Sequence, residues 1–270
     1  MITIINIIIM TSGNMPGERR GSSASCRFLI FVALILFALA VFSFHSSAAP
    51  TGAGQIISGT PQKYNNNLTP TTVEAEAGNV TQLLINTTRL TRRWQGFYGN
   101  LTGNVVLSDA RNNSIYSWQL VPSGEVYASN KSSVDWNSIK CANFSSNLSD
   151  GWTFNISTLE SFYGAGSADI DGIDETFNNT YSNASGFSVG TKVINSQSRC
   201  PLAYTFVNGA YQQHEYEELL LTDNSSIIYT TLLENRQPGF NSQGNDFQLL
   251  VAENGDDPSP TSYYFFVELS

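Results

Sequence analysis

The chain has 270 residues and a formal net charge of -9 at neutral pH, from 13 basic and 22 acidic residues. An acidic chain repels phosphate backbones and anionic lipid, which excludes nucleic acid as a partner and argues against binding to a membrane surface by charge. Only 13% of the residues are charged, so Asn, Ser, Thr and Gln must supply the polar surface, a composition typical of secreted β proteins.

The first predicted element is an apolar run, residues 28–44, which follows three arginines and contains no charge. This layout is that of a secretory signal or an N-terminal membrane anchor, so we interpret residues 1–48 as a leader with an apolar helix. Small residues at Ser46 and Ala48 favour cleavage after Ala48 over retention as an anchor. The remaining chain is expected outside the cell or at its surface, with the N-terminal helix as its one contact with the membrane.

Another route of processing stays open at the same end. Arg20-Gly21 resembles the cleavage point of type IV prepilins, which makes a pilin-like subunit a further alternative. In prepilins the apolar helix begins almost at the cut, whereas here residues 22–27 intervene and end in a charge. We therefore rank this route below a secretory signal and an anchor.

Residues 49–72 are rich in Gly, Pro, Asn and Thr and have no lasting apolar period, which predicts a flexible linker. Residues 73–270 are predicted to form one extracellular domain. Short runs of β-branched and aromatic residues, bounded by turn residues, predict strands at 80–86, 93–99, 102–109, 114–120, 124–129, 187–194, 202–208, 214–223, 226–235, 245–253 and 262–269. Residues 134–144 and 157–164 could each form a short helix.

This order of elements predicts an all-β fold, an antiparallel β-sandwich of jelly-roll or immunoglobulin-like type with one or two short helices, preceded by the N-terminal apolar helix. The runs 226–235 and 245–253 are apolar enough for central strands. Within 114–120, alternation places Tyr116, Trp118 and Leu120 on one side of the strand, and this side is expected to face the core.

Two cysteines, Cys141 and Cys200, follow the leader, whereas Cys26 precedes the apolar run. Two cysteines in an oxidising compartment most simply form one disulfide. A pair of metal ligands is the alternative, but no His or Cys lies beside either residue at ligand spacing.

Asn-X-Ser/Thr sequons are the strongest statistical signal in the chain. Random pairing of the asparagines with Ser and Thr would give roughly five, whereas twelve occur, which indicates true N-glycan acceptors. They begin at Asn67, Asn79, Asn86, Asn100, Asn112, Asn130, Asn143, Asn147, Asn155, Asn178, Asn183 and Asn224. Because glycans are bulky, most of these positions are expected in loops or on outward-facing strand positions.

The segment 168–181 contains the best metal candidates, Asp169, Asp171, Asp174 and Glu175. Calcium prefers several hard oxygen ligands on a tight loop, and Gly172 could supply the bend. The order of residues departs from the EF-hand pattern, so a structural interpretation is favoured, in which Asp171 caps a short helix. No other cofactor is expected.

The blocks WQGFYGNLTGNVVLSDARNNSIYSW, GEVYAS, DETFNNT, NDFQLLVAENG and YYFFVEL, with the cysteine pair, resemble a group of archaeal secreted or surface-anchored proteins without an established activity. The resemblance covers almost all of residues 73–269. It implies an archaeal envelope protein that begins with an export leader, and it brings no catalytic residues.

A catalytic function finds little support in the sequence. Nucleophilic hydrolases need a base beside the nucleophile, and His214 is the one histidine beyond the leader region. Its strand, HEYEELLL, is expected to show a wet polar face, and paired carboxylates in a cleft stay open as an alternative. Aromatic residues could build a sugar-stacking platform, although core packing is their commoner role; they are Trp94, Phe97, Tyr98, Trp118, Tyr127, Trp136 and Trp152.

The leading hypothesis is a non-catalytic, glycosylated archaeal surface protein that acts in envelope structure, filament assembly or adhesion. Its expected partners are other envelope proteins or copies of itself, with glycans as a further class. The alternative is a carbohydrate-binding module or a secreted glycan hydrolase.

Overall fold

The computed structural model describes residues 49–63, 72–85, 87–119, 123–144 and 156–269. These residues belong to one compact unit, Ser47–Ser270. The predicted apolar helix and the predicted cleavage point lie outside the described residues.

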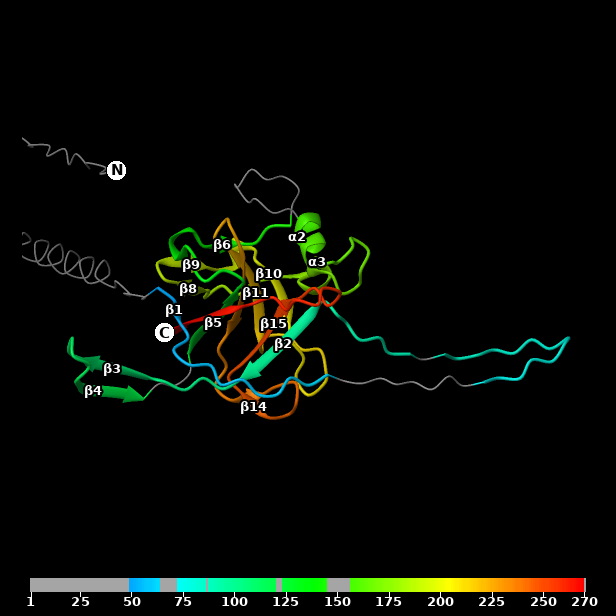
Figure 1. The fold of residues 1–270 in the computed structure, drawn as a ribbon, viewed down its shortest axis with the longest axis horizontal. Helices are drawn as coiled ribbons and strands as arrows, with labels where there is room; N and C mark the ends of the chain where they lie inside the picture. The colour runs from blue at the N-terminus through cyan, green and yellow to red at the C-terminus, as the bar shows by residue number, and fades with distance from the viewer. Residues whose placement is uncertain (1–48, 64–71, 86, 120–122, 145–155, 270) are drawn as a thin grey trace, which may run out of the picture. The chain divides into compact units, whose positions relative to one another are not determined.

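Antiparallel strands dominate the described residues, and the α-helices among them are two short ones, which confirms the all-β prediction (Figure 1). The main sheet has eight strands, with the order β1-β16-β5-β12-β11-β10-β7 and with β6 also paired to β11. Their bounds are β1 Thr51–Gly52, β5 Gly124–Ser129, β6 Lys140–Cys141, β7 Asn179–Thr180, β10 Pro201–Tyr204, β11 Glu217–Thr222, β12 Ile227–Leu232 and β16 Tyr264–Leu269.

Four further pairs of strands lie outside the main sheet. They are β2 Trp94–Gly99 with β15 Phe247–Ala252, β3 Asn104–Ser108 with β4 Ser114–Gln119, β8 Phe187–Val189 with β9 Lys192–Ile194, and β13 Gln237–Pro238 with β14 Gly244–Asn245. Strand β15 contacts β12 and β11, so the β2–β15 pair covers part of one face of the main sheet. The helical elements are α2 Ile156–Phe162, α3 Ile173–Thr176, and the 3₁₀ turns η1 Trp136–Ser138 and η2 Ser196–Ser198.

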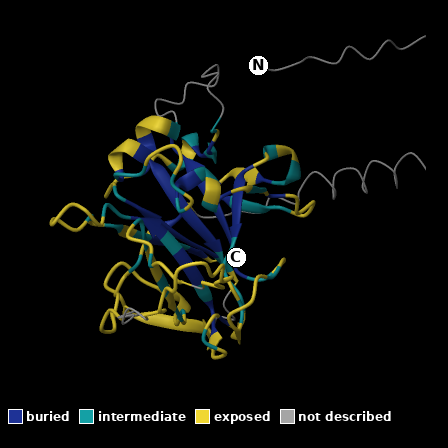
Figure 2. Cartoon of the chain, turned by 90° about the vertical axis from the view of Figure 1, so that its right-hand side faces the viewer, coloured by how far each residue is buried: buried dark blue, intermediate teal, exposed yellow. Residues whose placement is uncertain are grey.

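The core lies on both faces of the main sheet. Because side chains alternate along a strand, Tyr127, Leu219 and Ile228 pack on one face, while Leu220 and Tyr229 pack on the other. The second face is covered by β15 and by apolar residues of α2 and α3. Strands β11 and β12 are therefore buried almost throughout, and Figure 2 shows the central strands in dark blue.

One predicted strand, at residues 80–86, does not form over its described part. Residues 80–85 have strand-like composition but form no strand, and Val80 and Leu84 are 101% and 97% exposed. Propensity for β structure reflects packing against neighbours, and no strand of the described residues pairs with this segment.

Three other predicted elements differ in detail. The predicted linker contributes β1, which pairs with Phe266 and Val267 of β16. The run 187–194 is a hairpin rather than one strand, because Gly190 adopts a φ of 57° between β8 and β9. The run 245–253 forms β15, which pairs with β2, so of the two predicted central strands β12 alone is central in the main sheet.

Candidate functional site

The fold divides the acidic segment between two environments. The carboxylate of Asp169 accepts a hydrogen bond from the main-chain N–H of Gly166 at 2.8 Å and lies 3.9 Å from the guanidinium of Arg93. The Thr91 hydroxyl donates to Asp171, whose main-chain carbonyl accepts from Trp94 Nε1 at 2.8 Å. Asp169 and Asp171 thus connect the segment to residues at the start of β2, and they are not positioned as the predicted metal ligands.

The other two acids, Asp174 and Glu175, meet a third carboxylate that the sequence analysis missed. Glu160 of α2 brings a carboxylate oxygen to within 4.8 Å of those of Asp174 and Glu175, which lie in the first turn of α3. Glu160 is buried, and this burial, together with a hydrogen bond to Asp174, raises its pKa to about 7. No local sequence signal places Glu160 here, because the cluster depends on how α2 packs against α3.

The N-terminal end of α3 differs from the predicted one. Gly172 is the N-cap of α3 and makes no side-chain capping bond, so Asp171 is not the cap. The helix dipole of α3 can still favour the two acids in its first turn.

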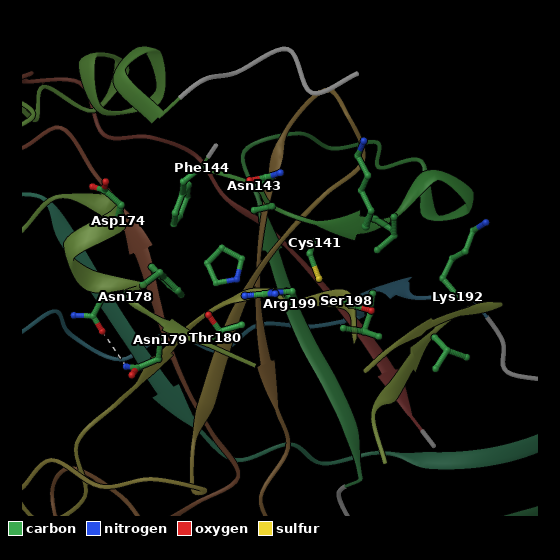
Figure 3. A pocket seen from close by; sticks show the side chains of 17 residues that line it. Cys141, Asn143, Phe144, Asp174, Asn178, Asn179, Thr180, Lys192, Ser198 and Arg199 are labelled. Carbon is green, nitrogen blue, oxygen red and sulfur yellow. Dashed lines mark hydrogen bonds between the residues drawn. The ribbon is translucent and has the colours of Figure 1, made fainter. Parts of the chain in front are cut away.

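A cleft of about 800 Å³ lies beside the disulfide (Figure 3). Three cationic side chains line it, those of Lys140, Lys192 and Arg199, together with one carboxylate, that of Asp174. Asn178 and Asn179 contribute amides, which are joined by a hydrogen bond of 2.9 Å. Aromatic surface comes from Phe144 and Phe177 on the same lining.

The chemistry of the cleft suits a polar anion. The chain has a net charge of -9, so three cations around one cleft form a local concentration of positive charge on an acidic protein. Within the described part of the chain, Lys192 and Arg199 make no ion pair. Amide groups and aromatic faces are the partners that sugars use, so the lining offers groups that an acidic sugar could contact.

The β3–β4 hairpin presents an apolar surface that nothing in the described chain covers. The register pairs Val105 with Trp118 and Leu107 with Tyr116, which places all four side chains on one face. These residues are 49 to 58% exposed, and the Tyr116 and Trp118 rings are 4.8 Å apart. We call them the hairpin face. The prediction that Tyr116 and Trp118 point into the core is therefore wrong.

A pair of buried acids is the second feature that the sequence analysis missed. Glu125 of β5 and Glu268 of β16 lie opposite each other and are 5% and 4% exposed. The Gly190 N–H donates to both oxygens of Glu268 at 3.0 Å, and the Tyr127 hydroxyl donates to one at 3.3 Å. Burial, and then the charge of Glu268, raises the pKa of Glu125 to about 8. The available sequence signal was an isolated glutamate within each apolar run. Only the register between β5 and β16 shows that these two glutamates lie opposite each other.

The polar face expected on HEYEELLL is buried as well. Glu217 and Glu218 are 9% and 0% exposed because β11 is covered on both sides. Burial raises the pKa of Glu218 well above its ordinary value, although the Leu250 N–H donates to it at 2.8 Å. His214, the candidate base, is exposed and lies before the strand at a φ of 83°.

The structure pairs Cys141 with Cys200 in a disulfide, with their Cα atoms 4.6 Å apart. Eight of the twelve sequon asparagines lie within the described residues, and each is outside the helices and strands. Asn130 and Asn224 are half-buried, and the exposed ones are Asn79, Asn100, Asn112, Asn143, Asn178 and Asn183. Asn67, Asn86, Asn147 and Asn155 lie outside the described residues.

The predicted aromatic platform does not form as one surface. Trp94 and Phe97 pack with the core on the β15 side, whereas Trp136 packs with Tyr127 on the other side of the sheet. Tyr98 and Trp118 are exposed on separate strand pairs, and Trp152 lies outside the described residues.

The described residues include no helix that combines the length and the apolar character needed to cross a membrane. No known protein family, no curated protein and no solved structure matches the chain. The proposals below therefore depend on the geometry of the described residues and on the sequence signals.

Proposed function

We propose that the protein is a non-catalytic glycoprotein of the archaeal cell surface, with a β-sandwich body of jelly-roll or immunoglobulin-like type behind an N-terminal export helix. Its function is to associate with neighbouring envelope proteins, including copies of itself. The observation that carries this proposal is the uncovered hairpin face of Val105, Leu107, Tyr116 and Trp118.

The energetics of a two-stranded hairpin support an external partner. An isolated hairpin is only marginally stable in water, and it gains stability when its apolar face packs against another surface. Large apolar side chains gathered on one exposed face mark interaction sites in soluble proteins. Tyr and Trp, which supply half of this hairpin face, are the residues most enriched in the energetic centres of interfaces.

The edges of the hairpin support the same role. Strands β3 and β4 pair with each other and with no other described strand, so each has one edge with unpaired main-chain groups. Such edges can add to the sheet of a neighbouring molecule. Export, the disulfide and the exposed sequons are all compatible with a position in the envelope.

The test is a double substitution on the hairpin face, Leu107→Ser with Trp118→Ser, in the exported native protein. We expect self-association, measured by sedimentation velocity, to weaken by about 30-fold or more, because a central Trp contributes about 2 kcal/mol or more to an interface. Ile115→Ser is the matched control, since Ile115 is 78% exposed on the other face of the hairpin. A wild-type protein that is monomeric in solution and crosslinks to no neighbour on intact cells would contradict the proposal.

A second candidate, a carbohydrate-binding function, is favoured by the cationic cleft of Lys140, Lys192 and Arg199. We expect Lys192→Ala with Arg199→Ala to lower the affinity for acidic oligosaccharides by about 10-fold or more, since each substitution removes a charged hydrogen-bond donor. Binding is measured by calorimetry, with Lys131→Ala, an exposed cation outside the cleft lining, as the control. Release of reducing ends during the titration would instead indicate a glycan hydrolase, and a mature N-terminus at Ser22 would indicate a pilin-like subunit.

A further inference from the structure

Three carboxylates from two short helices converge beside Gly172. Glu160 comes from α2, and Asp174 and Glu175 come from α3. One oxygen of each lies within 4.8 Å of the others, a separation that a single ion could bridge. Hard oxygen ligands at this spacing are those that calcium prefers.

The ion pairs of the described residues involve other acids. Arg93 lies 3.0 Å from Asp256 and 3.9 Å from Asp169. No ion pair joins Glu160, Asp174 or Glu175 to a basic side chain of the described residues. When all three carboxyl groups are ionised, they repel one another, and a bound cation would offset this repulsion.

Glu160 supplies a second, independent observation. Its side chain is 3% exposed, and its Oε1 atom is buried without a hydrogen-bond donor. A buried carboxylate oxygen without a partner destabilises the fold, so such atoms are normally satisfied by a donor or an ion. This atom belongs to the carboxylate that faces Asp174 and Glu175.

Gly172 lets the carboxylates of this cluster lie close to the backbone. A Cβ atom at Gly172 would lie 2.7 Å from Glu160 Oε1 and 3.2 Å from the main-chain oxygen of Asp169, and it would collide with the carboxylate of Glu175. The absence of a side chain at Gly172 therefore allows the carboxylate oxygens to approach the backbone at this point.

We propose that Glu160, Asp174 and Glu175 form a calcium-binding site over Gly172. Calcium accepts six to eight oxygen ligands in flexible geometry, so the three carboxylates can bind directly and water can complete the shell on the exposed side of Glu175. Magnesium prefers to keep most of its waters, which a buried ligand such as Glu160 opposes.

Calcium at this site would connect α2 with α3. Both helices supply core residues to the face that β15 covers, namely Leu159 of α2 and Ile173 of α3. The bound ion would therefore hold these helices against the sheet, and it would raise the thermal stability of the whole unit through mass action. This role is separate from the hairpin face and does not depend on it.

The test uses the full native protein after removal of divalent ions with a chelator. We expect calorimetry to show that calcium binds and that Glu160→Gln weakens this binding by at least 10-fold. Millimolar calcium should raise the Tm of the wild type by about 5 °C, and equal magnesium should have a much smaller effect. Glu74→Gln, which replaces an exposed acid far from α2 in the sequence, is the matched control and should respond like the wild type.

The stability of Glu160→Gln in the presence of chelator distinguishes a loss of calcium binding from a loss of folding. Without calcium, Glu160→Gln should be at least as stable as the wild type, because an amide removes a buried like charge from the cluster. Unchanged calcium affinity in Glu160→Gln, a Tm that does not respond to calcium, or an equal response to magnesium would each overturn the proposal.

Discussion

Replacement of both Cys141 and Cys200 by alanine is expected to lower the free energy of unfolding by about 4 kcal/mol, which corresponds to a fall in Tm of about 10 °C for a domain of this size. The two residues are 59 positions apart, and the enclosed chain carries α2, α3 and β7 to β9. Opening this loop increases the conformational freedom of the unfolded state, which disfavours folding.

The position of the bond makes this effect larger than the loss of a surface link. Cys141 lies in β6, which pairs with β11, and Cys200 is fully buried directly before β10. The bond therefore joins the two ends of the enclosed loop at the main sheet. Urea unfolding of the oxidised protein, the reduced protein and the double variant measures the effect. Equal stability of oxidised and reduced protein would contradict the prediction.

The second large effect is a loss of stability with rising pH. The folded state raises the pKa of Glu125 from 4.5 to about 8, so the folded protein retains a proton that the unfolded chain releases. The contribution of Glu125 is fully present below pH 4.5, decreases as the pH rises from 4.5 to about 8, and is lost above that. A difference of this size in pKa corresponds to about 5 kcal/mol across the window.

Comparison of variants isolates this contribution from the other buried acids. Glu125→Gln cannot ionise, so its stability should fall less steeply between pH 4.5 and pH 8 than that of the wild type. Glu268→Gln should reduce the slope only in part, because burial is the larger cause of the shift and the Glu268 charge the smaller. Urea unfolding at a series of pH values measures both slopes. Parallel pH profiles for the wild type and Glu125→Gln would contradict the assignment.

Local patterns were sufficient where a segment has both the propensity and a partner. The runs that became β5, β11, β12 and β16 were predicted within a few residues, since alternating or continuous apolar side chains indicate a buried strand whatever its neighbours are. The run 80–85 has the same composition but no partner, so composition alone was misleading. Non-local pairing is what separates the two cases.

The two clusters of acids also depend on contacts between residues that are distant in the sequence. Asp174 and Glu175 were candidates because they are adjacent in the chain, but Glu160 joins them only through the packing of α2 on α3. In the same way, Glu125 and Glu268 are 143 positions apart, and only the β5–β16 register makes them neighbours.

The sequence by itself determined the strand-rich class, the candidate disulfide pair and the positions of the sequons, because each depends on residues close together or on counting residue types. Only the tertiary structure decided which acids share a site and which apolar faces are covered. The hairpin face, which includes Tyr116 and Trp118, illustrates the reason. Alternation along the sequence shows that these two side chains lie on one side of a strand. Burial of that side requires a second layer of structure, and the described residues provide no such layer over the hairpin face.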